Sequence, residues 1–146
     1  MKKGFRLASV LRARQAQEDA ARGEVLRARR DAAQAADEAA AKDRTLANHE
    51  VPDEDTARAL VAALTARQAM AATLAIARQL AVVAESRVDE QTQELTEAAK
   101  RRRTVEKLAE RHAEQARRHA QAADQSMLDE LATSDPIRAA AREVRS

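Results

Sequence analysis

The sequence predicts an all-α fold: an antiparallel two-helix coiled-coil hairpin in which a long second helix overhangs the first. Of its 146 residues, 38 are alanine, only 27 carry larger apolar side chains and one is aromatic. A β-sheet requires β-branched and aromatic strands separated by turn residues, whereas this chain has two glycines and two prolines. Alanine-, arginine- and glutamate-rich sequences without such breakers are typical of long helices.

The first predicted helix covers about residues 5–48. Apolar residues recur in it at alternating spacings of three and four, which is the pattern of the side chains that meet along a coiled coil. We call these positions the seam. Arg14, Glu18 and Lys42 share the same spacing, so the seam of this helix also contains charged residues. Its larger apolar members are Leu7, Leu11, Val25 and Leu46.

A hinge at residues 49–53 separates the two predicted helices. Pro52 disfavours helical geometry at Val51, and either Asp53 or Asp55 is suited to cap the next helix. The second helix is expected over about residues 54–133, since no glycine or proline interrupts it. Pro136 is expected to end it, leaving residues 134–146 as a weakly helical tail. All of these elements belong to one predicted domain, residues 1–146.

The seam of the second helix is most regular in its middle. Its larger members are expected to include Leu80, Val88 and Leu95. Val105, Leu108 and His112 require a different phase, which predicts a local slip of the register. The most regular run of positions consists of Leu74, Ala77, Ala81, Ala84, Val88, Gln91, Leu95 and Ala98.

A hairpin that turns near residue 51 places Val25 near Arg78 and brings the first helix to its end beside about residue 98. The second helix then continues without a partner from the same chain. An isolated polar helix is held only by local interactions, so this overhang is expected to fray, to pair with another copy or to dock into another protein.

Charge is unevenly distributed along the chain. Residues 1–30 carry a net charge of +6, residues 31–60 carry −5 and residues 99–118 carry +5. Nucleic acid is the general partner of basic surfaces, but Phe5 is the single aromatic residue that could stack on bases, and glutamates interrupt the basic run. We therefore expect an acidic protein surface, and no nucleic acid, to contact a basic collar made of Arg101, Arg102, Arg103, Lys107 and Arg111.

Enzymatic, cofactor and metal sites are not expected. Two paired helices offer no concave pocket that excludes water around a nucleophile, and the chain has no cysteine. His49, His112 and His119 are spaced too widely to bind one metal ion together. The longest stretch without charge, residues 68–77, is far shorter than the roughly 20 residues that span a bilayer, so no direct membrane insertion is expected.

Three parts of the sequence resemble the FliJ-type flagellar export proteins. The opening Phe5-Arg6-Leu7 with Val10-Leu11 is similar to the start of that family. The stretch from Lys100 to Arg111 (KRRRTVEKLAER) and the later LDELA of residues 128–132 resemble its second helix. Together with the central acidic hinge, these parts span nearly the whole chain.

The resemblance implies a non-enzymatic part of the flagellar type III export apparatus. Proteins of this type are two-helix coiled coils similar to the central stalk of rotary ATPases. They bind and stimulate the ring of the export ATPase, contact the membrane-embedded export gate, and act as chaperone-like factors toward export substrates or their chaperones. For this chain, the resemblance implies gate contacts at Met70, Leu74 and Ile76, and a cytoplasmic location at the inner face of the inner membrane. The alternatives are a plain coiled-coil adaptor or dimer, and the equivalent stalk protein of an injectisome.

Overall fold

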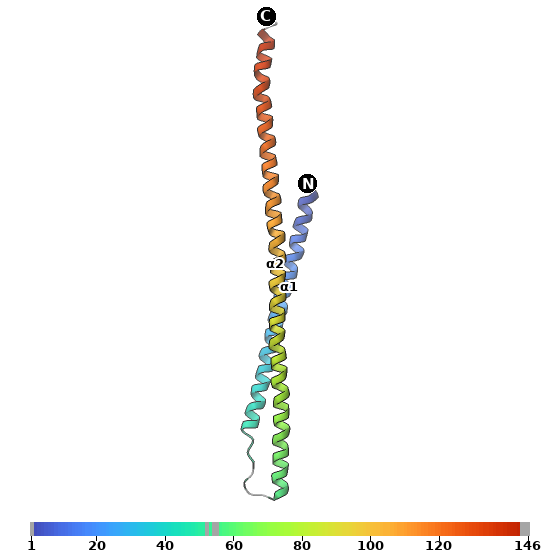
Figure 1. Ribbon diagram of the computed structural model, residues 1–146, viewed down its shortest axis with the longest axis vertical. Helices are drawn as coiled ribbons and strands as arrows, with labels where there is room; N and C mark the ends of the chain where they lie inside the picture. The colour runs from blue at the N-terminus through green and yellow to red at the C-terminus, as the bar shows by residue number, and fades with distance from the viewer. Residues whose placement is uncertain (1, 52, 54–55, 144–146) are drawn as a thin grey trace. The chain divides into compact units, whose positions relative to one another are not determined.

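Two long helices make up the fold (Figure 1). The computed structural model describes the backbone of residues 2–51, 53 and 56–143, and the side chains of residues 6–51, 53 and 56–134. Helix α1 comprises Lys2–Ala47 and helix α2 comprises Ala57–Glu143. The helices pack against each other, and the described residues contain no strand. The predicted all-α hairpin is therefore confirmed.

The chain divides into two compact units. One is Arg14–Arg101, which holds the connection between the helices. The other combines Met1–Ala13 with Arg102–Ser146. We call them the hairpin unit and the terminal unit, and describe each by itself.

Thr56 begins α2. Its carbonyl oxygen accepts hydrogen bonds from the backbone N–H groups of Ala59, at 2.9 Å, and Leu60, at 3.3 Å. An N-cap residue accepts the first helical hydrogen bonds in this way, and threonine is among the favoured types. Asp53 is therefore not the cap, while Asp55 lies outside the described residues. The predicted start at residue 54 is too early for the same reason.

The backbone of α2 remains helical past Pro136 and ends at Glu143. The expected end at residue 133 is therefore wrong. A proline removes one hydrogen bond of the helical ladder and crowds the preceding turn, which disfavours the helix without forbidding it. The residues after Pro136 include three consecutive alanines, which have the highest helix propensity.

The register of the hairpin unit differs from the predicted one. The Arg78 guanidinium binds the Asp43 carboxylate at 3.1 Å, so Asp43 and not Val25 lies beside Arg78. A ring nitrogen of His49 lies 3.4 Å from the Ala63 carbonyl oxygen, well inside α2. The end of α1 therefore lies beside a part of α2 that is well past the start of that helix at Ala57 (Figure 1). Residues outside a helix advance farther than the roughly 1.5 Å of a helical residue, and a symmetric turn at residue 51 ignores this difference.

Most of the predicted seam positions are buried or half-buried. All eight positions of its most regular run, from Leu74 to Ala98, are buried or half-buried. On α1, Leu7, Leu11 and Leu46 are half-buried, Val25 is 4% exposed and the charged Glu18 is 5% exposed. The Arg22 guanidinium donates to the Glu18 carboxylate at 2.8 Å, so this buried charge is compensated.

Three predicted seam positions are wrong. Lys42 is exposed, Leu80 is 58% exposed and Leu108 is 49% exposed. The half-buried Arg102, Val105, Ala109 and His112 continue the alternating spacing of α2 without a slip. Leu80 and Leu108 were predicted as seam residues because they are hydrophobic. The phase of the helix instead turns smaller or charged residues near them toward α1.

The buried side chains are small. The buried apolar residues are Val25, Ala28, Ala32, Ala39, Leu74, Ala77 and Ala98. Each alanine in place of leucine forgoes about 2 kcal/mol of apolar burial, at ~0.8 kcal/mol per methylene. The free energy of packing is therefore concentrated in a few residues, above all Val25 and Leu74.

One part of α2 is strongly apolar. Between Ala57 and Ser134, an 18-residue window reaches a mean hydropathy of 1.5, and 6% of that window is buried. By length and composition alone this helix is apolar enough to cross a membrane, although its longest stretch without charge is residues 68–77. A single arginine interrupts an uncharged stretch but lowers the mean hydropathy of an 18-residue window only partly.

Replacing leucine by alanine at two nearby positions of α2 tests the seam. We expect Leu74→Ala to lower the free energy of unfolding by about 2–3 kcal/mol, because it leaves a cavity at a buried position. Leu80→Ala, the matched exposed control, is expected to change it by less than ~0.5 kcal/mol. Thermal unfolding followed by circular dichroism measures both. Equal losses at the two positions contradict the assigned seam.

Candidate functional site: a basic stripe on α2

The residues of the predicted basic collar occupy different environments. Within the terminal unit, the Arg102 side chain is only 24% exposed and donates to the Glu106 carboxylate at 2.7 Å. Arg103, Lys107 and Arg111 are exposed. Arg102 therefore belongs to the packing of its unit, whereas the other three face solvent.

Arg103, Lys107 and Arg111 are spaced by four residues along α2. Residues four apart lie on the same face of a helix, one turn above the other. None of the ion pairs between described side chains involves any of the three. We call this row of uncompensated cations the basic stripe.

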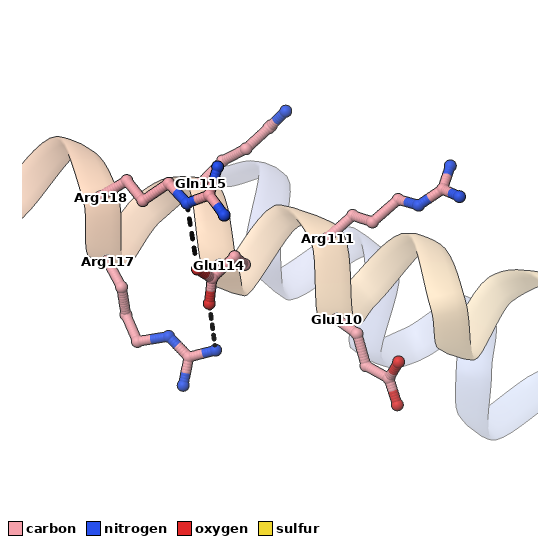
Figure 2. Close-up of a pocket in the computed structure, with 6 residues that line it drawn as sticks. All are labelled: Glu110, Arg111, Glu114, Gln115, Arg117 and Arg118. Atoms are coloured by element: carbon pink, nitrogen blue, oxygen red, sulfur yellow. Dashed lines mark hydrogen bonds and ion pairs between the residues drawn. The ribbon is translucent and has the colours of Figure 1, made fainter.

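The stripe ends at a paired cluster in the next turn. The Glu114 carboxylate accepts a hydrogen bond from Arg117 at 2.8 Å and another from Arg118 at 3.0 Å. Figure 2 shows these two arginines turned toward Glu114, whereas Arg111 extends away from it. Arg117 and Arg118 are thus partly neutralised by their own helix, and Arg111 remains available to an external anion.

Arg101 lies in the hairpin unit and is exposed. Successive helical residues are separated by ~100°, so Arg101 points about 160° away from Arg103 around the helix axis. The consecutive arginines 101–103 therefore do not form one surface. The sequence prediction placed them together because it used their spacing without the direction of each side chain.

The chemistry available to the basic stripe is electrostatic. Three guanidinium or ammonium groups on an open helical surface attract carboxylates and other anions, and arginine binds them in bidentate fashion. Among the described residues, no group of three or more His, Cys, Asp or Glu side chains is arranged to hold a metal ion. The geometry fits a binding surface for an acidic partner.

A second surface lies in the hairpin unit, where exposed apolar residues of α2 lie beside the seam and next to α1. The three predicted gate residues are not equivalent there. Leu74 is 4% exposed, Met70 is half-buried and Ile76 is 62% exposed. Of these three, Ile76 alone offers most of its side chain to a partner. Ile76 and Leu80, together with Glu38 and Lys42 of α1, line a groove of about 200 Å³.

Sequence reasoning missed most of this apolar surface. A usable signal was present, because no acidic residue occurs between Thr56 and Ala84. A long acid-free stretch with many exposed apolar residues is unusual for a helix in contact with water only. The additional exposed apolar residues are Leu60, Val61, Leu64, Val82 and Val83.

Comparison with known protein families identifies the family of this chain. The model of the family described as flagellar FliJ protein matches residues 1–141, almost the entire chain. The chain belongs to the FliJ family. No curated protein and no solved structure gives a significant match.

Membership assigns the chain to the flagellar type III export apparatus, at the base of the flagellum in the cell envelope. FliJ proteins are structural parts of that apparatus, and its other components are their partners. The basic stripe and the apolar surface of the hairpin unit are accordingly candidates for contacts within an export assembly.

The different roles of two adjacent arginines are testable. Arg102→Glu is expected to lower the free energy of unfolding by about 1 kcal/mol or more, because it breaks a partly buried ion pair and places a second carboxylate near Glu106. Arg103→Glu is expected to leave stability within ~0.5 kcal/mol, since Arg103 is exposed and has no ion pair. Chemical denaturation of both variants measures the difference. A destabilised Arg103 variant with an unaffected Arg102 variant reverses the assignment.

Proposed function

We propose that this FliJ-family chain acts as a stalk-like subunit that binds and stimulates the ring of the flagellar export ATPase. The observation that carries the proposal is the basic stripe: Arg103, Lys107 and Arg111 lie on one helical face, and none of them forms an ion pair with another described side chain. An acidic lining of a ring pore is complementary to such a row. Exposed charges of this kind steer association and fix its orientation, with a strong dependence on salt.

The apolar surface of the hairpin unit is our proposed contact with the membrane-embedded export gate. Of the predicted gate residues, Ile76 is the most exposed, whereas Leu74 is buried in the seam beneath this surface. We further propose that the same family role includes a chaperone-like contact with export substrates or their chaperones, at the cytoplasmic side of the inner membrane. An equivalent stalk role in an injectisome is the alternative, and the genes adjacent to this one, flagellar or needle genes, distinguish the two.

Charge reversal of the stripe tests ring binding. Simultaneous Arg103→Glu, Lys107→Glu and Arg111→Glu substitutions are expected to abolish stimulation of ATP hydrolysis by the cognate export ATPase. The wild-type stimulation is expected to fall as salt rises, because salt screens contacts between exposed charges. The ATP hydrolysis rate, with and without the chain at several salt concentrations, measures both effects.

The matched control carries the same change of charge elsewhere on α2. Arg58, Arg67 and Arg87 are exposed and have no ion pair among the described residues. Their reversal to glutamate is expected to leave stimulation largely intact. If the stripe variant still stimulates hydrolysis, or the control loses as much activity, the stripe is only a solvated face.

The gate contact is tested at Ile76. Ile76→Glu is expected to weaken binding to the cytoplasmic part of the gate protein by about tenfold or more, since a charge in an apolar contact costs more than ~1.4 kcal/mol. Its melting temperature is expected to stay near that of the wild type because Ile76 is 62% exposed. Leu108→Glu, at another exposed leucine of α2, serves as the control in a pull-down or calorimetric titration. If the Ile76 variant binds the gate protein as tightly as the wild type, the apolar surface is not the gate contact.

A further inference from the structure

The seam of the terminal unit continues beyond the residues that are covered. Val105 and Ala109 are half-buried seam positions of α2. Eleven residues correspond to about three helical turns, so positions eleven residues later lie on nearly the same face. The step from Val105 leads to Ala116 and then to Met127, and the step from Ala109 leads to Ala120 and then to Leu131.

This continuation has no cover among the described residues. Every side chain from Gln115 to Thr133 is exposed. The exposure includes three large apolar residues, since Met127 is 64%, Leu128 is 65% and Leu131 is 58% exposed. The interface between the two helices is thus followed by an apolar stripe that lies within about 40° of its phase and that no described residue covers.

We propose that a second copy of this chain covers the stripe, with residues 115–133 of the two copies paired in antiparallel orientation. The proposal rests on continuity with the α1–α2 interface and on the arrangement of charge and side-chain size along this segment. It is independent of the ring-binding function, because it concerns the chain alone.

The charge of the segment is divided along its length. Its first part contains Arg117, Arg118 and His119 and no acid, and its second part contains Asp124, Asp129 and Glu130 and no base. Antiparallel pairing places the basic part of one copy beside the acidic part of the other. Parallel pairing places like charges side by side, which is unfavourable along a helical pair.

Side-chain size follows the same division. The stripe positions of the first part are the alanines Ala116 and Ala120, and those of the second part are the large Met127 and Leu131. In an antiparallel pair centred between residues 123 and 124, Ala116 faces Leu131 and Ala120 faces Met127. Each layer then combines one small and one large residue, which packs more evenly than layers of two alanines alternating with layers of two large residues.

Cysteine cross-linking of the full chain tests the arrangement, because the chain has no cysteine of its own. Ala120→Cys and Met127→Cys variants are oxidised separately and as an equimolar mixture. We expect the mixture to form a disulfide-linked species of twice the 16.0 kDa of the chain, while each variant alone does not. In the antiparallel pair, equivalent positions 120 lie about 10 Å apart along the axis, farther than the roughly 7 Å between Cα atoms that a disulfide tolerates.

A matched control uses Ala122→Cys mixed with Gln125→Cys. These residues lie at the same height in the proposed pair but point away from the stripe, so no cross-link is expected. Light scattering of the wild type over a concentration series is expected to show reversible association, which Met127→Gln with Leu131→Gln reduces without loss of helix content. Cross-linking of each variant with itself as readily as in the mixture, or a wild-type mass of 16.0 kDa at every concentration, overturns the proposal.

The cross-linking result and the hydrolysis measurement are separable. If the cross-link does not form, the proposal of self-association is wrong, but the proposed role of the basic stripe is unaffected. Loss of stimulation in the stripe variant, conversely, does not alter the contacts of residues 116–131. If both hold, a chain paired through this segment is a resting form in which that segment is unavailable to other partners.

Discussion

Close packing of alanines along the seam is the constraint on which the rest of the structure depends. Ala28, Ala32, Ala39, Ala77 and Ala98 occupy buried positions where most coiled coils carry leucine or valine. Small side chains allow two helical backbones to approach but bury little apolar area, so the free energy of pairing per turn is low. Residues such as Leu74 therefore carry a disproportionate share of the stability.

The same constraint explains why most large apolar and charged side chains of the chain are exposed. A seam of small residues uses only a narrow face of each helix, and the remaining faces carry the large apolar and the charged side chains. The direction of each side chain then decides its role. Arg102 turns into the packing of its unit and binds Glu106, while Arg103, one position later, turns to solvent and joins Lys107 and Arg111. In the hairpin unit, Leu74 and Ile76 are separated by the same logic, two residues apart and on different sides of α2.

The short connection between the helices is accompanied by a large axial offset between their ends. His49 lies against the Ala63 carbonyl group, and Asp43 binds Arg78, so the ends of the helices are not level at the turn. Sequence periodicity identifies which residues of each helix face inward, but it contains no information on the axial offset between the helices. The offset is marked in the connection by the contact of His49 with the Ala63 carbonyl group, a contact between residues far apart in the sequence. For that reason the seam was predictable almost residue by residue, and its register was not.

The sequence by itself determined the all-helical class, the break near Pro52, the seam from Leu74 to Ala98 and the resemblance that the family match bears out. Each of these follows from local composition or from a period of three to four residues, which the chain encodes directly. Only the tertiary structure decided that Asp43 lies beside Arg78, that Leu80 is outside the seam, and that three cations of the predicted collar share one free face. The first feature depends on how far one helix is shifted along the other, and the other two depend on which side of α2 packs against α1. Many shifts satisfy the same alanine-rich pattern, and contacts between distant residues select one of them.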